Sequence, residues 1–125
     1  MIAYIEAPDI MERVKEIIFK LELDHVQIEN IACFRSKGSA AEGTIARCHA
    51  LSRIMQQGLK RPPFYAIEVL SEEFDKMDEE EQTKTLIHEV LHIPHAFGGG
   101  FKHHNVVNKR NVEKLYKLYK DNGKS

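Results

Sequence analysis

The chain has 125 residues, of which 42% are hydrophobic and 30% charged, with a formal net charge of −1. This length is typical of one domain, so we expect a single domain over residues 1–125 with a core that needs no disulfides. No apolar run approaches the roughly 20 residues that span a bilayer, and the charge gives no general attraction to nucleic acid or membranes. Two cysteines, and acids and a proline within residues 1–10 where a leader would be apolar, predict a cytoplasmic protein.

Hydrophobic periodicity and turn signals predict a mixture of strands and helices. Strands are expected at residues 26–35, 44–51 and 64–70. Helices are expected at residues 9–21, 52–59, 78–93 and 105–120, with a turn or short helix at 71–77. Asp9 with Glu12 forms a capping-box pattern for the first helix, and Ser71 is a plausible cap for the short one. Asp78, followed by three glutamates, is the clearest helix start in the chain.

The first two strands are predicted to form a hairpin. A turn centred near Ala40 would place Cys33 opposite Cys48. We interpret these as two reduced thiols on one sheet, with a disulfide, or a second metal site involving His49, as alternatives. The third strand, residues 64–70, is assigned to an edge of the sheet.

Histidine is the unusual feature of the composition, because five of the seven histidines fall within residues 88–104. Residues 88–92 read His-Glu-Val-Leu-His, an HExxH motif in a predicted amphipathic helix. Residues four apart lie on one helix face, so His88 and His92 could bind one metal ion. Glu89 lies about 100° further round the helix, where it could act as general base towards a metal-activated water.

Two histidines need a third protein ligand to build a catalytic zinc site. Pro94 ends the helix, and the glycine run at residues 98–100 would let the chain reverse onto the metal. His104 and His103 are the candidates beyond this loop, and Glu113 is a third, although it lies among lysines, where a surface ion pair would also explain it. His95 could be a ligand, or a loop histidine beside the site.

Residues 88–104 resemble the HExLHIPxxFxGxxxxH segment of the small zinc metallopeptidases, or minimal zincins, of archaea, bacteria and phages. The similarity extends upstream through residues 46–49 and 64–74. The resemblance implies an α+β, minimal zincin-like fold: a small, mostly antiparallel sheet with an active-site helix and flanking helices. It also implies that His104 completes a Zn²⁺ site with His88 and His92.

The sequence therefore predicts a zinc-dependent metallopeptidase acting on peptide or protein substrates, with Glu89 as the catalytic base. The strand at residues 64–70 is expected to align an extended peptide by edge pairing. One alternative is a non-catalytic metal-binding module, closed by His95 or a further histidine as fourth ligand. Another is a three-histidine zinc nuclease acting on RNA, favoured by the basic residues from Lys102 to Lys124.

Overall fold

A computed structural model of the chain describes residues 1–39, 43–104 and 106–122. This described part contains four strands and five α-helices, so the predicted α+β class is confirmed. The strands are β1 (Ala3–Glu6), β2 (Ile31–Lys37), β3 (Ala46–Ala50) and β4 (Tyr65–Leu70). The helices are α1 (Pro8–Lys20), α2 (Arg53–Leu59), α3 (Ser71–Phe74), α4 (Glu79–Leu91) and α5 (Lys109–Asn122), with a 3₁₀ turn at Ile28–Asn30. One domain over residues 1–125 stays a prediction.

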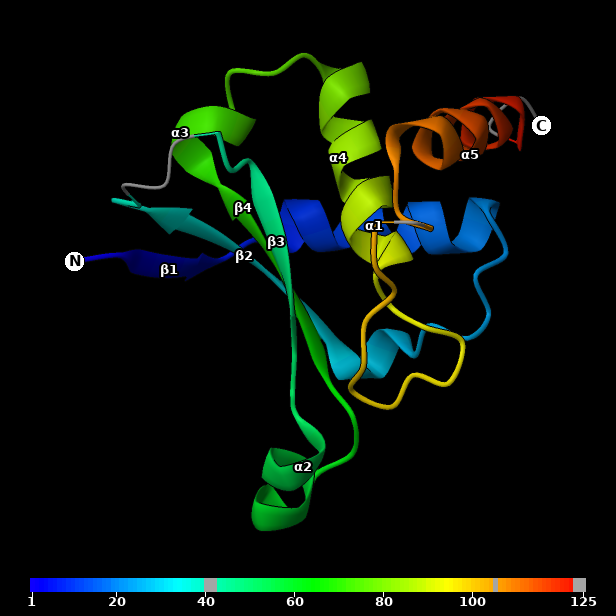
Figure 1. Ribbon diagram of the computed structural model, residues 1–125. Coiled ribbons are helices and arrows are strands. Elements are labelled where there is room, and N and C mark those ends of the chain that lie inside the picture. The colour runs from blue at the N-terminus through cyan, green and yellow to red at the C-terminus, as the bar shows by residue number, and fades with distance from the viewer. Residues whose placement is uncertain (40–42, 105, 123–125) are drawn as a thin grey trace.

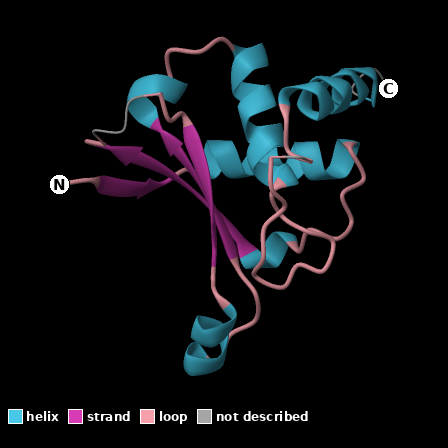
Figure 2. Ribbon diagram, viewed as in Figure 1, coloured by secondary structure: helices cyan, strands magenta, loops and turns pink. Residues whose placement is uncertain are grey.

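The four strands form one mixed sheet in the order β1-β2-β4-β3. The β1–β2 and β3–β4 pairs are antiparallel and the β2–β4 pair is parallel, so the sheet is mostly antiparallel, as predicted. Helices α1, α4 and α5 pack against one another on one side of the sheet, while α2 projects from its far end (Figures 1 and 2). Strand β1 was not predicted, because four residues are too few to show a period.

Strand β4 lies in the centre of the sheet, and the predicted hairpin is therefore wrong. Five of its six residues are buried, which suits a central strand with neighbours on both sides better than an edge strand. It separates β2 from β3, so these two strands do not pair with each other. The predicted turn at Ala40 lies outside the described residues.

The two cysteines flank the central strand instead of facing each other. Cys33 on β2 and Cys48 on β3 are both in register with Ile67 of β4, one on each side of it. Neither thiol forms a disulfide, and both lie on one sheet as interpreted, with Cys33 buried and Cys48 partly buried. Burial raises the pKa of each thiol to about 12, so neither is a reactive thiolate near neutral pH.

The main core lies between the sheet and helices α1 and α4. Its fully buried side chains share the inner face of the sheet and the facing sides of both helices: Ile10, Val14, Ile17, Ile67, Val69, Leu86, Ile87 and Val90. The predicted capping box of α1 is wrong, because the helix begins at Pro8 and Asp9 lies in its first turn. Asp9 instead pairs with Arg35 of β2 at 2.7 Å, and Pro8 needs no hydrogen-bond acceptor at this position.

Two further helix starts differ from the prediction. Helix α3 begins at Ser71 itself, which makes no capping hydrogen bond. Helix α5 begins at Lys109, because the side chain of Asn108 accepts a hydrogen bond from Asn111 N at 2.9 Å. The predicted first residue of that helix, Asn105, lies outside the described residues. His104 therefore belongs to the preceding loop and not to the start of a helix.

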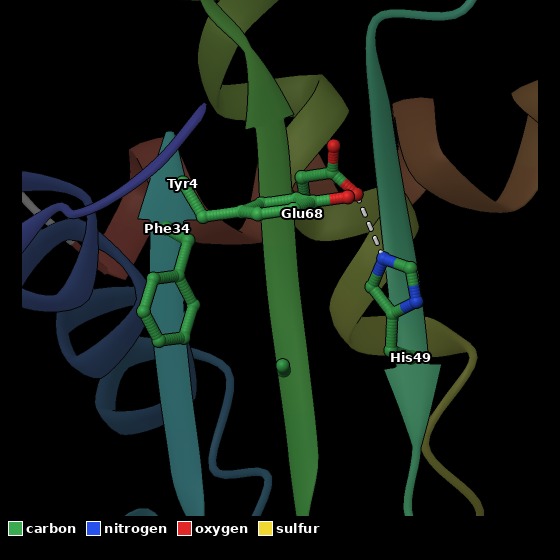
Figure 3. Close-up of a pocket in the computed structure, with 5 residues that line it drawn as sticks. Tyr4, Phe34, His49 and Glu68 are labelled. Atoms are coloured by element: carbon green, nitrogen blue, oxygen red, sulfur yellow. Dashed lines mark hydrogen bonds and ion pairs between the residues drawn. The ribbon is translucent and has the colours of Figure 1, made fainter. Parts of the chain in front are cut away.

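The face of the sheet that points away from the helices carries a buried carboxylate (Figure 3). Glu68 is 2% exposed and accepts hydrogen bonds from Ser36 Oγ at 2.5 Å and His49 Nε2 at 2.8 Å, with Arg47 Nη1 at 3.8 Å. Burial would raise the pKa of Glu68, but these partners hold it below its usual value. A shallow pocket of about 310 Å³ lies here, lined by Tyr4, Phe34, His49, Ala66 and Glu68. Glu68 thus ties the central strand to both neighbours.

Candidate metal centre

Helix α4 presents two histidines on one face. Asp78 caps its start, accepting a hydrogen bond from Glu81 N at 2.9 Å, as predicted. The helix is fixed on the core by Leu86, Ile87 and Val90, each of which is at most 1% exposed. Four-residue spacing brings the rings of His88 and His92 to 5.1 Å between centroids. The helix ends at Leu91 with His92 as its C-cap, close to the predicted end.

The glycine loop after Pro94 turns back and is fastened to the α2 region. Gly99 has φ +104°, and a Cβ at this position would lie 2.6 Å from Gln56 Nε2 and 2.8 Å from Leu51 O. The Gln56 amide donates to Leu51 O at 2.8 Å and to Gly98 O at 3.1 Å. Glycine is required here for both conformation and space. The sequence pattern gave no signal for the role of Gln56.

Tyr65 of β4 fastens the same loop from the sheet. Its buried hydroxyl donates to Gly100 O at 2.8 Å and accepts from Gly99 N at 2.9 Å. Its ring lies 4.9 Å from that of Phe97 and 6.2 Å from that of Phe101. The sequence left Tyr65 without a role; in the structure its hydroxyl is committed to the loop backbone.

Lys102 returns the chain to the end of α4 and orients one histidine. Lys102 N donates to His92 O at 2.8 Å, and Nδ1 of His92 lies 2.7 Å from Lys102 O. When Nδ1 carries the proton and donates to this carbonyl, Nε2 is left as the lone-pair nitrogen that a metal ion requires. The contact therefore selects both the ring orientation and the tautomer of His92.

His104 completes a cluster of three histidines. Its ring lies 5.6 Å from that of His88 and 5.2 Å from that of His92 between centroids. One ligand nitrogen from each of the three histidines lies within 4.8 Å of the others, close enough to hold one metal ion. No other group of three His, Cys, Asp or Glu side chains in the described ranges meets this spacing. The cluster borders a pocket of about 370 Å³.

The structure brings none of the alternative ligands into this cluster. His103 is exposed and borders the pocket, but it is not part of the three-histidine group. Glu113 lies on α5 and forms an ion pair with Lys84 Nζ at 2.9 Å. His95 packs against His25, with ring centroids 4.3 Å apart. The surface ion pair considered for Glu113 is therefore the arrangement found.

Glu89 lies buried beside the histidines. It is 6% exposed, borders the same pocket, and its Oε2 atom is 4.0 Å from His88 Nε2. Burial raises the pKa of Glu89 to about 7, because the carboxylate is removed from water. Burial also lowers the pKa of His88, an effect to which charged His92 and His104 would add. A carboxyl group that titrates near neutral pH is suited to accepting and returning a proton.

The three histidines could hold a metal ion, and a comparison with known protein families was made with this site in view. A family model described as "Putative phage metallopeptidase" matches residues 2–123. The chain belongs to this family. The resemblance drawn from residues 88–104 is thereby confirmed at the level of the family. No curated protein and no solved structure matches the chain.

Membership of the phage metallopeptidase family implies a metal ion, and the histidine cluster fits one. Imidazole nitrogens are ligands that zinc prefers, and three of them leave a fourth position open, as in catalytic sites. The family name also implies a hydrolase with peptide substrates. In the part of the chain that the structure describes, no helix is long and apolar enough to cross a bilayer.

Proposed function

We propose that this protein is a zinc-dependent metallopeptidase that hydrolyses peptide bonds. The observation that carries the proposal is the convergence of three histidines from α4 and the loop with a buried glutamate at one pocket. His88, His92 and His104 are the proposed ligands, and Glu89 is the proposed catalytic base. A zinc ion at this site would supply Lewis-acid chemistry, polarising a water molecule and the scissile carbonyl.

Glu89 is placed to move the proton that hydrolysis requires. Its carboxylate borders the same pocket as the histidines, and in the metal-free chain burial raises its pKa to about 7. It would take a proton from the attacking water and return it to the leaving amine. Glu89 is itself only 6% exposed, and a carboxylate removed from water interacts more strongly with nearby charges.

The substrate is proposed to align along β3, which corrects the expectation for residues 64–70. Strand β4 has neighbours on both sides, whereas β3 is an edge strand whose outer backbone groups are not paired within the sheet. Ala46, Arg47 and Cys48 of β3 border the same pocket as the histidines. An extended peptide could therefore add to this edge with its scissile bond beside Glu89.

A Glu89→Gln variant tests the proposal, with Glu113→Gln as the matched control. We expect Glu89→Gln to retain bound zinc, measured by elemental analysis, and to lose hydrolysis of a casein or mixed-peptide substrate. Glu113→Gln, the same change at a half-buried residue outside the pocket, should retain both properties. Full hydrolysis by Glu89→Gln would overturn the role of Glu89, and a wild-type protein without metal would overturn the site.

The same experiment separates the alternatives. Retained zinc with no hydrolysis of peptides or RNA by the wild type would favour a metal-binding module. The structure argues against a closed four-ligand site formed by His95, because that ring packs against His25. Hydrolysis of RNA but not of peptides would favour the nuclease.

A further inference from the structure

Helix α2 and its flanking residues form a projection at the end of the sheet. The segment from Ser52 to Arg61, here called the α2 tip, connects edge strand β3 to central strand β4 and extends away from the helical layer (Figure 1). None of the residues of α2 is buried, so the helix contributes no side chain to the core. Packing within the chain therefore does not explain which side chains this helix carries.

The α2 tip exposes large apolar side chains. Ile54 is 79% exposed, Met55 50% and Leu59 52%. Met55 and Leu59 are four residues apart on the helix and share one side, with Ile54 next to Met55 in the chain. Single exposed apolar residues are ordinary, but three on one seven-residue helix form a patch of the kind that marks an interaction site.

The same segment is cationic. Arg53, Lys60 and Arg61 are exposed, and none of the ion pairs between described residues involves them. No aspartate or glutamate occurs in residues 43–67, although the whole chain contains 19. The exposed apolar side chains thus share a short segment with three exposed cations, and the segment contains no acid.

The α2 tip is held in a defined conformation. Ser52 Oγ accepts a hydrogen bond from Met55 N at 3.4 Å, and Arg61 N donates to Gln56 O at 3.0 Å. The Gln56 side chain ties the helix to the glycine loop at Gly98 O. The exposed side chains are therefore presented by an ordered element, so little conformational freedom is lost when they bind a surface.

We propose that the α2 tip docks on an anionic lipid surface. Its apolar side chains would enter the boundary between headgroups and acyl chains, while the three cations meet lipid phosphates. A second copy of the chain is disfavoured as the occupant because two cationic tips repel each other. Nucleic acid would use the cations but leave the apolar patch exposed to water.

This proposal differs from the expectation, drawn above from the sequence, that the chain is not attracted to membranes. That expectation rested on the absence of a spanning segment and on a net charge of −1 over the whole chain. Docking on a membrane surface requires neither a spanning helix nor a positive net charge of the whole chain. It depends on the charge and the apolar area of one local surface. It is also independent of whether the metal site hydrolyses peptides.

Vesicle co-sedimentation of the full chain tests the proposal. We expect binding to phosphatidylcholine vesicles that contain phosphatidylglycerol and none to phosphatidylcholine alone. The double variant Ile54→Ser/Met55→Ser and the single variant Arg61→Glu should each weaken binding by about tenfold or more. Circular dichroism and zinc content should match the wild type, because these side chains are exposed and lie outside the histidine cluster.

Two control variants make the same changes elsewhere on the surface. Phe19→Ser removes an apolar side chain that is 82% exposed on α1, and Lys117→Glu reverses an exposed charge on α5. Both controls should bind vesicles like the wild type. Absence of wild-type binding to the anionic vesicles, or equal loss in the control and α2 variants, would overturn the proposal.

Discussion

The two halves of the histidine cluster are held in different ways. His88 and His92 lie on α4, whose position is fixed by apolar side chains packed on the sheet. His104 lies in a loop, and that loop is fixed by hydrogen bonds between the side chains of Gln56 and Tyr65 and backbone atoms of residues 98–100. The helix half depends on burial and local spacing, while the loop half depends on directional contacts between distant residues.

This difference explains which half the sequence could predict. A cap at Asp78, the apolar repeat and the HExxH spacing all act within 15 residues, so they determined α4 closely. The contacts that hold the loop join residues 34 to 42 positions apart, and no periodic pattern records them. The choice of His104 over His103 and Glu113 came from a family resemblance and not from the residues alone.

The largest expected effect is the loss of zinc affinity on removing the loop ligand. His104→Ala should weaken zinc binding by about 100-fold or more, since removing a group that only orients a ligand already costs roughly 10- to 100-fold. Competitive titration with a chelator measures this. His103→Ala and Glu113→Ala should bind zinc like the wild type, since neither residue is in the cluster. Normal zinc affinity in His104→Ala would show that α4 alone builds the site.

The second prediction compares adjacent glycines of the loop. Gly99→Ala should lower the free energy of unfolding by roughly 1–3 kcal/mol, because its Cβ would meet Gln56 Nε2 and Leu51 O at a positive φ. It should also weaken zinc binding, since the displaced loop carries His104. Gly100→Ala should be tolerated, because a Cβ there has no neighbour within 4 Å. Chemical denaturation and zinc titration measure both effects, and equal behaviour of the two variants would contradict a fixed loop.

The third prediction removes one hydroxyl from the loop anchor. Tyr65→Phe keeps the ring contacts but loses two hydrogen bonds, each contributing about 1 kcal/mol, so the free energy of unfolding should fall by about 1–2 kcal/mol. Zinc affinity should fall less than in Gly99→Ala, since the backbone itself is not displaced. Tyr4→Phe, a change at a residue that is 60% exposed, is the control. Unchanged stability and zinc affinity in Tyr65→Phe would show that the Tyr65 hydroxyl does not anchor the loop.

In the sheet, the positions of the strands follow from local sequence patterns, whereas their pairing depends on contacts between distant residues. Hydrophobic patterns located three of the four strands to within a few residues, but the pairing of those strands was wrong. A hairpin between residues 26–35 and 44–51 is the simplest connection for neighbours in sequence, yet the more buried β4 occupies the position between them. Burial of a whole strand on both faces outweighs proximity in the chain, and only the three-dimensional arrangement records it.

The contacts on the outer face of the sheet were the least predictable from the sequence. The predicted strand ended one residue before Ser36, His49 was considered for a second metal site, and Glu68 was placed in an edge strand. The structure joins all three in one hydrogen-bonded group on adjacent strands. Register decides such contacts, and a single wrong pairing changes every cross-strand neighbour.

The smallest expected effect is a pH dependence of the free energy of unfolding, which arises where the end of α4 meets the loop that carries His104. His25 Nε2 lies 3.2 Å from Ile93 O, between the end of α4 and the loop, and its ring packs on His95. Burial lowers the pKa of His25 below 6.5; nearby Lys102 and charged His95 add to this, while the Ile93 hydrogen bond and Asp24 oppose it. The folded state therefore favours neutral His25.

The sign of the effect follows from this lowered pKa. Above pH 6.5 neither state protonates His25, and its full contribution to stability is present. As the pH falls below 6.5, the unfolded chain binds the proton first, so the free energy of unfolding falls until the folded pKa is reached. His25→Gln, measured by urea denaturation of metal-free protein, should flatten that slope relative to the wild type. Because His88 also has a lowered pKa but remains in both proteins, the difference between them reports His25 and its contact with His95. An identical slope in the two proteins would mean that protonation of His25 does not affect the stability of this junction.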